Sequence, residues 1–281
     1  MIKYLLNAIA VLAFVSAIPS YSRAAGNLMV TPTRVVFEER TRSAQVTLVN
    51  QGTETGNFRI SFIRQNMTEN GEFEAVSESE AGLFSDPMIR YSPRQVSLPP
   101  GQSQVIRLQL RRPNALDDGE YRSHMLFQAL PSPSSTSIEK AAAGSSEGIT
   151  IELIPIVGVS IPVIVRQGEL VSAVALANAK IIPAANESAN TRISIEISRQ
   201  GGSSVYGDFR VSFTPDGGAP VVVAQANGVS VYANINKRRF EMPLNFPAGV
   251  NLLNGVLDIA FINSGSDIET GTLARTRLEL N

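Results

Sequence analysis

Apolar and polar side chains alternate along most of this chain with a period of two residues. The alternation is clearest at residues 58–62, 106–110, 193–197 and 209–213. Because successive side chains of a β-strand point to opposite faces, this pattern predicts strands with one buried face. Turns such as Pro99-Pro100-Gly101 separate the runs, and no run has the period of an amphipathic helix of three turns. We therefore expect an all-β fold.

The predicted strands form two series, one before and one after residues 166–168. Short alternating strands with Gly, Pro and Asn between them are typical of immunoglobulin-like β-sandwiches. We therefore expect two such domains joined by a linker at these residues. Residues 173–179 are rich in alanine and would also fit a helix, but their position between strands favours a strand.

The longest alternating run covers residues 149–165, where every second side chain is apolar except Pro155. A strand of about 17 residues would extend about 55 Å, whereas a typical strand spans only about 17–20 Å. Proline cannot donate to a β-ladder and is confined to edges, strand starts and bulges. Part of this run should therefore project, follow a sheet edge or pair with another chain. The alternative is a long core strand bent by a bulge.

An exposed edge can bind an extended partner through its backbone, while alternate side chains fill pockets of the partner. The first half of the run is the candidate, because it follows the small and polar segment 132–148, which we expect to be a mobile loop. The second half leads into the linker and is expected in the core of the first domain. The candidate binding side chains are Ile149, Ile151, Leu153 and Val157.

The first residues indicate an export signal. Lys3 precedes an apolar run at residues 5–18, and Ser22-Arg23-Ala24 offers small residues for signal cleavage. About 14 apolar positions are too few to span a bilayer, which requires about 20. We expect a signal peptide at residues 1–24, a first domain at 25–166 and a second at 167–281. An uncleaved interfacial anchor is the alternative.

Composition excludes several classes of function. The formal net charge is −1, which does not indicate a nucleic-acid partner, and no later segment is long and apolar enough for stable membrane insertion. The chain has no cysteine and one histidine, His124, so a His-rich or thiolate metal site is not available. A serine triad using His124 would lack a G-x-S-x-G context, and we interpret His124 as a structural residue within a strand. We expect no catalytic residue, no metal and no cofactor.

Four stretches resemble one family. Residues 33–37 read TRVVF, 93–108 read PRQVSLPPGQSQVIRL, 119–127 read GEYRSHMLF and 163–166 read VIVR. They resemble, in this order, four features of the periplasmic chaperones of the chaperone–usher pathway. These are the first-strand T-R-x-x-F signature, the proline-glycine turn with its following strand, the F strand of the first domain and the end of its G strand. The resemblance covers about residues 30–168; the second domain is similar only in strand pattern. It implies a boomerang-shaped pair of immunoglobulin-like domains located in the periplasm.

The resemblance also implies a function. Chaperones of this family bind pilus or surface-fibre subunits that lack their last strand, and the G strand fills the gap until an outer-membrane usher exchanges it for another subunit. This is donor-strand complementation, used in fimbrium biogenesis. Ile149, Ile151, Leu153 and Val157 would then be the donor side chains, with Val159 as a further candidate. Pro155 falls where the family has an apolar donor, so the register stays open, as does self-association of the free protein.

In the family, a first-strand arginine and a G-strand lysine grip the terminal carboxylate of the subunit. Arg34 matches the arginine, and a guanidinium can clamp a carboxylate through two hydrogen bonds. The lysine position falls on Pro162, which suggests a divergent branch: another cation substitutes, or Arg34 works with backbone donors, or the anchor differs. Arg166 fits one member of the family's charged cluster between the domains. The alternative for Arg34 is an ordinary surface arginine, and the alternative for Arg166 is a simple linker arginine.

Two other classes of function are weighed against this one. A secreted fibre or adhesin component would carry an N-terminal extension of alternating apolar residues, whereas residues 25–31 are short and polar. An exported hydrolase or carbohydrate-binding enzyme would place carboxylates or aromatic rings in a cleft, and the chain has no tryptophan. We therefore expect a subunit chaperone rather than an enzyme.

Overall fold

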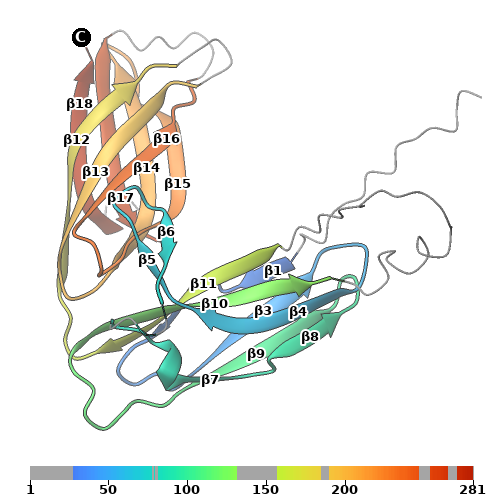
Figure 1. Cartoon of the computed structure of the whole chain (residues 1–281). Helices are drawn as coiled ribbons and strands as arrows, with labels where there is room; N and C mark the ends of the chain where they lie inside the picture. The colour runs from blue at the N-terminus through green and yellow to red at the C-terminus, as the bar shows by residue number, and fades with distance from the viewer. Residues whose placement is uncertain are drawn as a thin grey trace, which may run out of the picture.

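The computed structural model describes residues 28–77, 79, 82–131, 157–184, 190–246, 254–264 and 271–280. These residues form two β-sandwiches whose long axes make an L (Figure 1). The all-β fold of two immunoglobulin-like domains in a boomerang arrangement is thereby confirmed. The expected signal peptide at 1–24, the segment 132–148 and residues Ile149, Ile151, Leu153 and Pro155 lie outside the described residues.

The N-terminal domain contains two main sheets. One sheet has the order β1-β3-β9-β7, formed by Leu28–Thr31, Ser43–Asn50, Ser103–Leu110 and Ile89–Ser92. The other has the order β2-β11-β10-β4-β8, formed by Val35–Phe37, Gly158–Gln167, Gly119–Leu130, Gly56–Ile63 and Gln95–Leu98. A small hairpin, β5 and β6 (Gln65–Met67 and Phe73–Ala75), and a short 3-10 helix, η1 (Asp86–Met88), complete the domain.

Alternating apolar residues of these two sheets meet in one core. Leu48 and Leu108 from the first sheet pack with Phe127, Ile161 and Val163 from the second, and each of these side chains is buried. Burial of such side chains contributes about 1.5–3 kcal/mol each. The chain has no disulfide, so this burial is the main stabilising contribution to the domain.

The C-terminal domain repeats the plan. Its sheets are β12-β13-β16 (Ser172–Ile182, Arg192–Gly201, Lys237–Pro243) and β15-β14-β17-β18 (Val221–Val231, Val205–Pro215, Gly255–Asn263, Thr272–Leu280). Stacked rings of Phe209 and Phe261, with centroids 4.7 Å apart, lie in its core. The strand predicted at residues 173–179 is confirmed, because it lies within β12.

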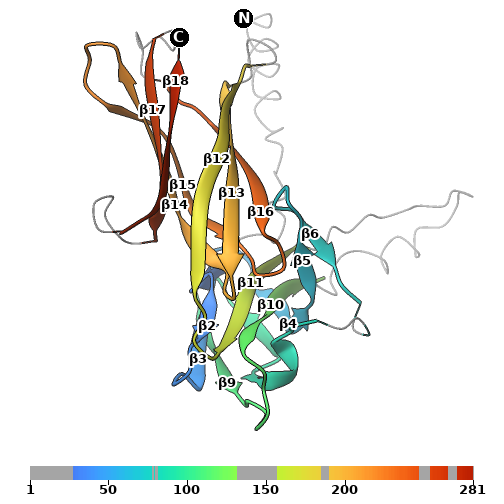
Figure 2. The same cartoon turned by 90° about the vertical axis from the view of Figure 1, so that its left-hand side faces the viewer.

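The two domains meet over an interface as well as through the linker. β11 ends at Gln167 and β12 begins at Ser172. Between them, Gly168 has a φ of +77°, and a Cβ atom there would lie 2.3 Å from the Asp118 carboxyl carbon, so the bend requires glycine. The β5–β6 hairpin rises from the N-terminal domain toward β16 (Figures 1 and 2). The domain boundary that we expect between residues 166 and 167 stays a prediction.

Candidate functional site: the cleft between the domains

The first half of β11 is an open sheet edge. β10 pairs with β11 over its whole length, from Gly158 to Gln167, whereas β2 pairs on the other side only with residues 163–165. Among the described residues, no strand covers that side of residues 158–162. Unpaired backbone groups on such an edge can accept a further strand.

Two of the expected donor side chains lie at this edge within the described residues. Val157 is 44% exposed. Val159 is half-buried and packs against the core of the N-terminal domain, and Ile161 is fully part of that core. The run therefore changes from exposed to buried between Val157 and Ile161, so the accessible apolar positions end just before β2 begins to pair.

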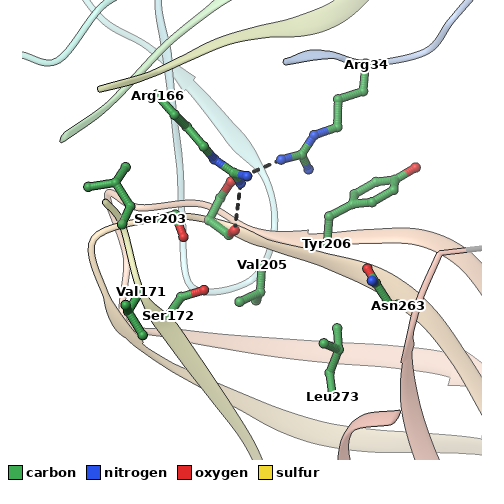
Figure 3. A pocket seen from close by; sticks show the side chains of 11 residues that line it. Arg34, Arg166, Val171, Ser172, Ser203, Val205, Tyr206, Asn263 and Leu273 are labelled. Carbon is green, nitrogen blue, oxygen red and sulfur yellow. Dashed lines mark hydrogen bonds between the residues drawn. The ribbon is translucent and has the colours of Figure 1, made fainter. Parts of the chain in front are cut away.

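Arg34 lies where the first strand leaves one sheet and joins the other, between β1 and β2. Its Nη2 donates to Ser204 Oγ of the C-terminal domain at 3.2 Å, and its guanidinium lies 4.6 Å from the centroid of the Tyr206 ring (Figure 3). Its Nη1 is buried and has no acceptor among the described residues. Burial lowers the pKa of Arg34 from its ordinary value, which reflects the cost of holding this charge away from water.

Two clefts flank Arg34. One, of about 360 Å³, is lined by Thr33, Arg34, Pro162, Tyr206, Asn227, Gly228, Ser230 and Tyr232. The other, of about 580 Å³, is seen in Figure 3, where Arg34 and Arg166 extend toward each other over the C-terminal domain. The fold thus brings Arg34 and Pro162, the two positions that the resemblance implies for the anchor, to the same cleft. Arg34 is the one charged side chain among the residues lining this smaller cleft.

Arg166 is at the centre of a charged cluster that joins the domains. Its Nε donates to Glu120 Oε2 and its Nη1 to Glu38 Oε1, both at 3.0 Å, and its Nη2 donates to the Ser204 carbonyl oxygen at 3.2 Å. Glu120 is only 3% exposed, and its Oε2 also accepts from the Ser204 amide and hydroxyl at 2.9 Å. All three donors reach Oε2, whereas the buried Oε1 has no partner among the described residues, so the charge of this carboxylate is compensated on one oxygen.

A second set of contacts connects β10 and the β5–β6 hairpin to the C-terminal domain. The Arg122 guanidinium lies 3.8 Å from the centroid of the Tyr232 ring and donates to Asn234 Oδ1 at 3.1 Å. Asn234 Nδ2 donates to the Met67 carbonyl oxygen at 2.8 Å. Met67 and Tyr232 also pack with Ile164 in an apolar cluster between the domains. Burial lowers the pKa of Arg122 to about 10, so this side chain remains charged at neutral pH.

Arg199 positions the loops that carry the interface residues of the C-terminal domain. It is buried and donates to four carbonyl oxygens, those of Gly201, Ser203, Ala233 and Ile235, and to Asn236 Oδ1. These acceptors lie in the loop before Ser204 and in the loop after Tyr232. A guanidinium can satisfy several loop carbonyls at once because its N–H donors point in fixed directions.

The sequence analysis did not identify Glu120, Arg122, Arg199, Ser204 and Tyr232 as site residues. One signal was present for Glu120, which lies in the 119–127 stretch that resembles the F strand. In the antiparallel register of β10 and β11, Glu120 stands directly opposite Arg166. Pairing the two strands from their ends at Gly119 and Gln167 would have placed the acid beside the arginine.

His124 is 2% exposed, in β10, and neither of its ring nitrogens has a hydrogen-bond partner among the described residues. Burial, and secondarily the charge of Arg122, lower its pKa to about 3. In the part of the chain that the structure describes, no three His, Cys, Asp or Glu residues gather in an arrangement that could hold a metal ion. No helix there has the length and apolar character needed to cross a membrane.

These features define a class of protein: two immunoglobulin-like domains at an angle, with an open strand edge that leads into a basic cleft between them. Residues 27–166 match the family described as pili and flagellar-assembly chaperone, PapD N-terminal domain. The chain belongs to this family of pilus assembly chaperones. A comparison with curated proteins found no match.

Solved structures of chaperones match most of this chain at low sequence identity. The YadV chaperone is 12% identical with a TM-score of 0.43, covering 90% of this chain and 100% of the other. The Pseudomonas aeruginosa CupB2 chaperone is 12% identical with a TM-score of 0.40, covering 90% and 99%. A chain from the complex of Salmonella enterica SafA pilin with the SafB chaperone is 14% identical with a TM-score of 0.40, covering 91% and 97%.

Proposed function

We propose that this protein is a non-enzymatic periplasmic chaperone that binds pilus or surface-fibre subunits by donor-strand complementation and delivers them to an outer-membrane usher. The observation that carries the proposal is the continuity of the open edge of β11 with the cleft at Arg34. A subunit strand paired along residues 158–162 would run toward the point where β2 closes the edge. Its end would then lie beside Arg34 and Pro162.

The donor side chains in this proposal are Ile149, Ile151, Leu153, Val157 and Val159. Val157 is exposed at the edge, which supports this role. Val159 is already half-covered by the core of the chaperone's own domain, so we expect it to contribute less than Val157. Burial of an exposed valine in a subunit contributes about 1.5–3 kcal/mol before the costs of association.

Arg34 is the proposed anchor for the terminal carboxylate of the subunit. Its Nη1 has no acceptor in the described part of the chain, and leaving a buried donor unpaired costs about 1–3 kcal/mol, more when the group is charged. A carboxylate that reached the guanidinium would remove this cost and form a charge-assisted hydrogen bond. Arg166 is the proposed inter-domain contact, through its bond to Ser204.

The test is capture of a subunit from the periplasm of the native host by the C-terminally tagged protein. We expect the wild type to retain an incomplete β-sandwich subunit, and Leu153→Asp with Val157→Asp to lose it. Val222→Asp is the matched control, because Val222 is similarly exposed, at 48%, on a strand of the C-terminal domain. Equal capture by the edge variant and the wild type would exclude this edge as the binding surface.

The anchor is tested separately with Arg34→Ala. Its matched control is Arg94→Ala, because Arg94 also lies over a tyrosine ring, that of Tyr91, at 5.2 Å within the N-terminal domain. We expect Arg34→Ala to lose the subunit and Arg94→Ala to retain it, with both variants folded by circular dichroism. Retention by Arg34→Ala would remove Arg34 from the anchor and leave the edge proposal intact.

A further inference from the structure

Among the described residues, the smaller of the two clefts beside Arg34 is lined by one positively charged side chain, no lysine and two tyrosines. Pro162 cannot donate a hydrogen bond or supply a charge, and Arg34 is the one charged residue among those lining this cleft. The side chains with hydroxyl groups that line it include Tyr206 and Tyr232, both from the C-terminal domain. Each tyrosine hydroxyl can donate one hydrogen bond.

Within the part of the chain that the structure describes, neither the Tyr206 nor the Tyr232 hydroxyl makes a hydrogen bond. A Cβ atom placed on Gly228 would lie 3.0 Å from the Tyr206 hydroxyl oxygen, and Gly228 also lines the cleft. The Tyr206 ring lies under the Arg34 guanidinium. Tyr206 therefore presents its hydroxyl to the cleft while its ring supports the cation.

Tyr232 is fixed in place on several sides. It is 4% exposed, its ring lies under Arg122, and its ring centroid is 6.0 Å from that of Phe73 and 6.2 Å from that of His124. Its side chain thus reaches the cleft as a preorganised group, so an added ligand would not have to order it first.

The surroundings of Tyr232 favour an anion. The Arg122 guanidinium lies 3.8 Å from the centroid of the Tyr232 ring, and Arg34 lines the same cleft as Tyr232. Two guanidinium groups therefore lie near this one phenol. The carboxylate that faces them, Glu120, is already bonded to Arg166 and Ser204. A tyrosine hydroxyl can donate one hydrogen bond to such an anion.

We propose that the terminal carboxylate of the bound subunit is held by Arg34 together with the hydroxyls of Tyr206 and Tyr232. This inference rests on the proposed function and changes the composition of the anchor. Phenol donors from the C-terminal domain take the place of a second cation on β11. The anchor is then made by both domains, and it is complete only when the domains hold their present angle.

The first experiment measures carboxylate binding without a subunit. Four of the six tyrosines remain after residue 24, so the ring signals of a ¹³C-tyrosine-labelled mature protein can be assigned with Tyr→Phe variants. We expect sodium acetate, but not acetamide, to shift the Tyr206 and Tyr232 signals in a saturable way. Tyr232→Phe should weaken acetate binding about tenfold, because it removes one hydrogen bond to a charged acceptor. Absence of a saturable shift would overturn the inference.

The second experiment uses the subunit captured by the wild type. Tyr232→Phe and Tyr206→Phe keep both rings, and we expect each to retain less subunit than the wild type and the double variant to retain least. Tyr91→Phe is the control, because its hydroxyl donates to Ile60 within the N-terminal domain. If the double variant retains as much subunit as the wild type while Arg34→Ala retains none, the tyrosines are not part of the anchor and the proposed function stands. If the wild type retains no subunit, the proposed function fails, and this inference fails with it.

Discussion

Buried His124 should make this protein sensitive to mild acid. Its pKa in the folded state is about 3, against an ordinary value of 6.5. Between these values the unfolded chain binds a proton that the folded chain does not, so stability falls as the pH drops through about 6.5. The loss attributable to this residue is about 1.4 kcal/mol at pH 5.5 and about 2.7 kcal/mol at pH 4.5, relative to neutral pH.

The matched variant is His124→Leu. Neither ring nitrogen has a partner among the described residues, so an apolar side chain of similar size removes an unpaired polar group, which is worth about 1–3 kcal/mol. The lost ring contacts with Phe73 and Tyr232, with centroids 5.0 and 6.2 Å away, are worth about 0.5–1.5 kcal/mol each. We therefore expect the two proteins to be similarly stable at pH 7.5 and to diverge below pH 6.

The assay is urea unfolding followed by circular dichroism at pH 7.5, 5.5 and 4.5, with equal denaturant slopes as the control for equal exposure of surface. Carboxylates titrate in both proteins, so the difference between wild type and variant isolates the histidine. The chain has one histidine, so its ring signal in an NMR spectrum is unambiguous and should not titrate between pH 7.5 and 4.5. A constant stability difference over this range, or a ring that titrates near 6, would refute the reasoning.

Three further substitutions test the interface and its supports. Arg166→Ala leaves Glu120 buried without its main partner and should destabilise the protein by about 3–5 kcal/mol in thermal unfolding, with part of the loss recovered by adding Glu120→Gln. Gly168→Ala should lower the free energy of unfolding by more than about 1 kcal/mol. Adding Asp118→Gly should relieve the overlap of the new Cβ atom with the Asp118 carboxyl group, but not the unfavourable φ. Arg199→Met should lower the urea midpoint more than Arg166→Ala does, because several loop carbonyls lose their donor together; an equal or smaller effect would mean that water replaces the guanidinium.

The fold was largely predictable because it depends on a local pattern. A period of two fixes which side chains face the core, and the same alternation places Leu48, Leu108 and Ile161 inside the first sandwich. The strand β12 could be assigned despite its alanine content only from its neighbours. The short strand β1 was not predicted, because four residues with a half-exposed pattern carry too little alternation.

The site was less predictable because its members come from distant parts of the chain. Arg34 and Pro162 could be identified by resemblance, since Arg34 lies in a stretch similar to the family and Pro162 directly precedes another. Tyr232 and Ser204 carry no local pattern that sets them apart. They reach the cleft only because the bend at Gly168 and the loops held by Arg199 turn one end of the C-terminal domain toward β10 and β11.

Ser204 links the cohesion of the two domains to the orientation of the candidate anchor. Its hydroxyl accepts from Arg34 and donates to Glu120, while its amide donates to the same carboxylate oxygen that Arg166 contacts. Arg34 therefore has a fixed direction only while the C-terminal domain is docked, since the side chains that it contacts among the described residues, Ser204 and Tyr206, belong to that domain. A change in the angle between the domains would move Ser204, Tyr206 and Tyr232 away from Arg34 together. Such a change would also break the contacts of Ser204 with Arg166 and Glu120, so the candidate anchor and the interface between the domains would be lost together.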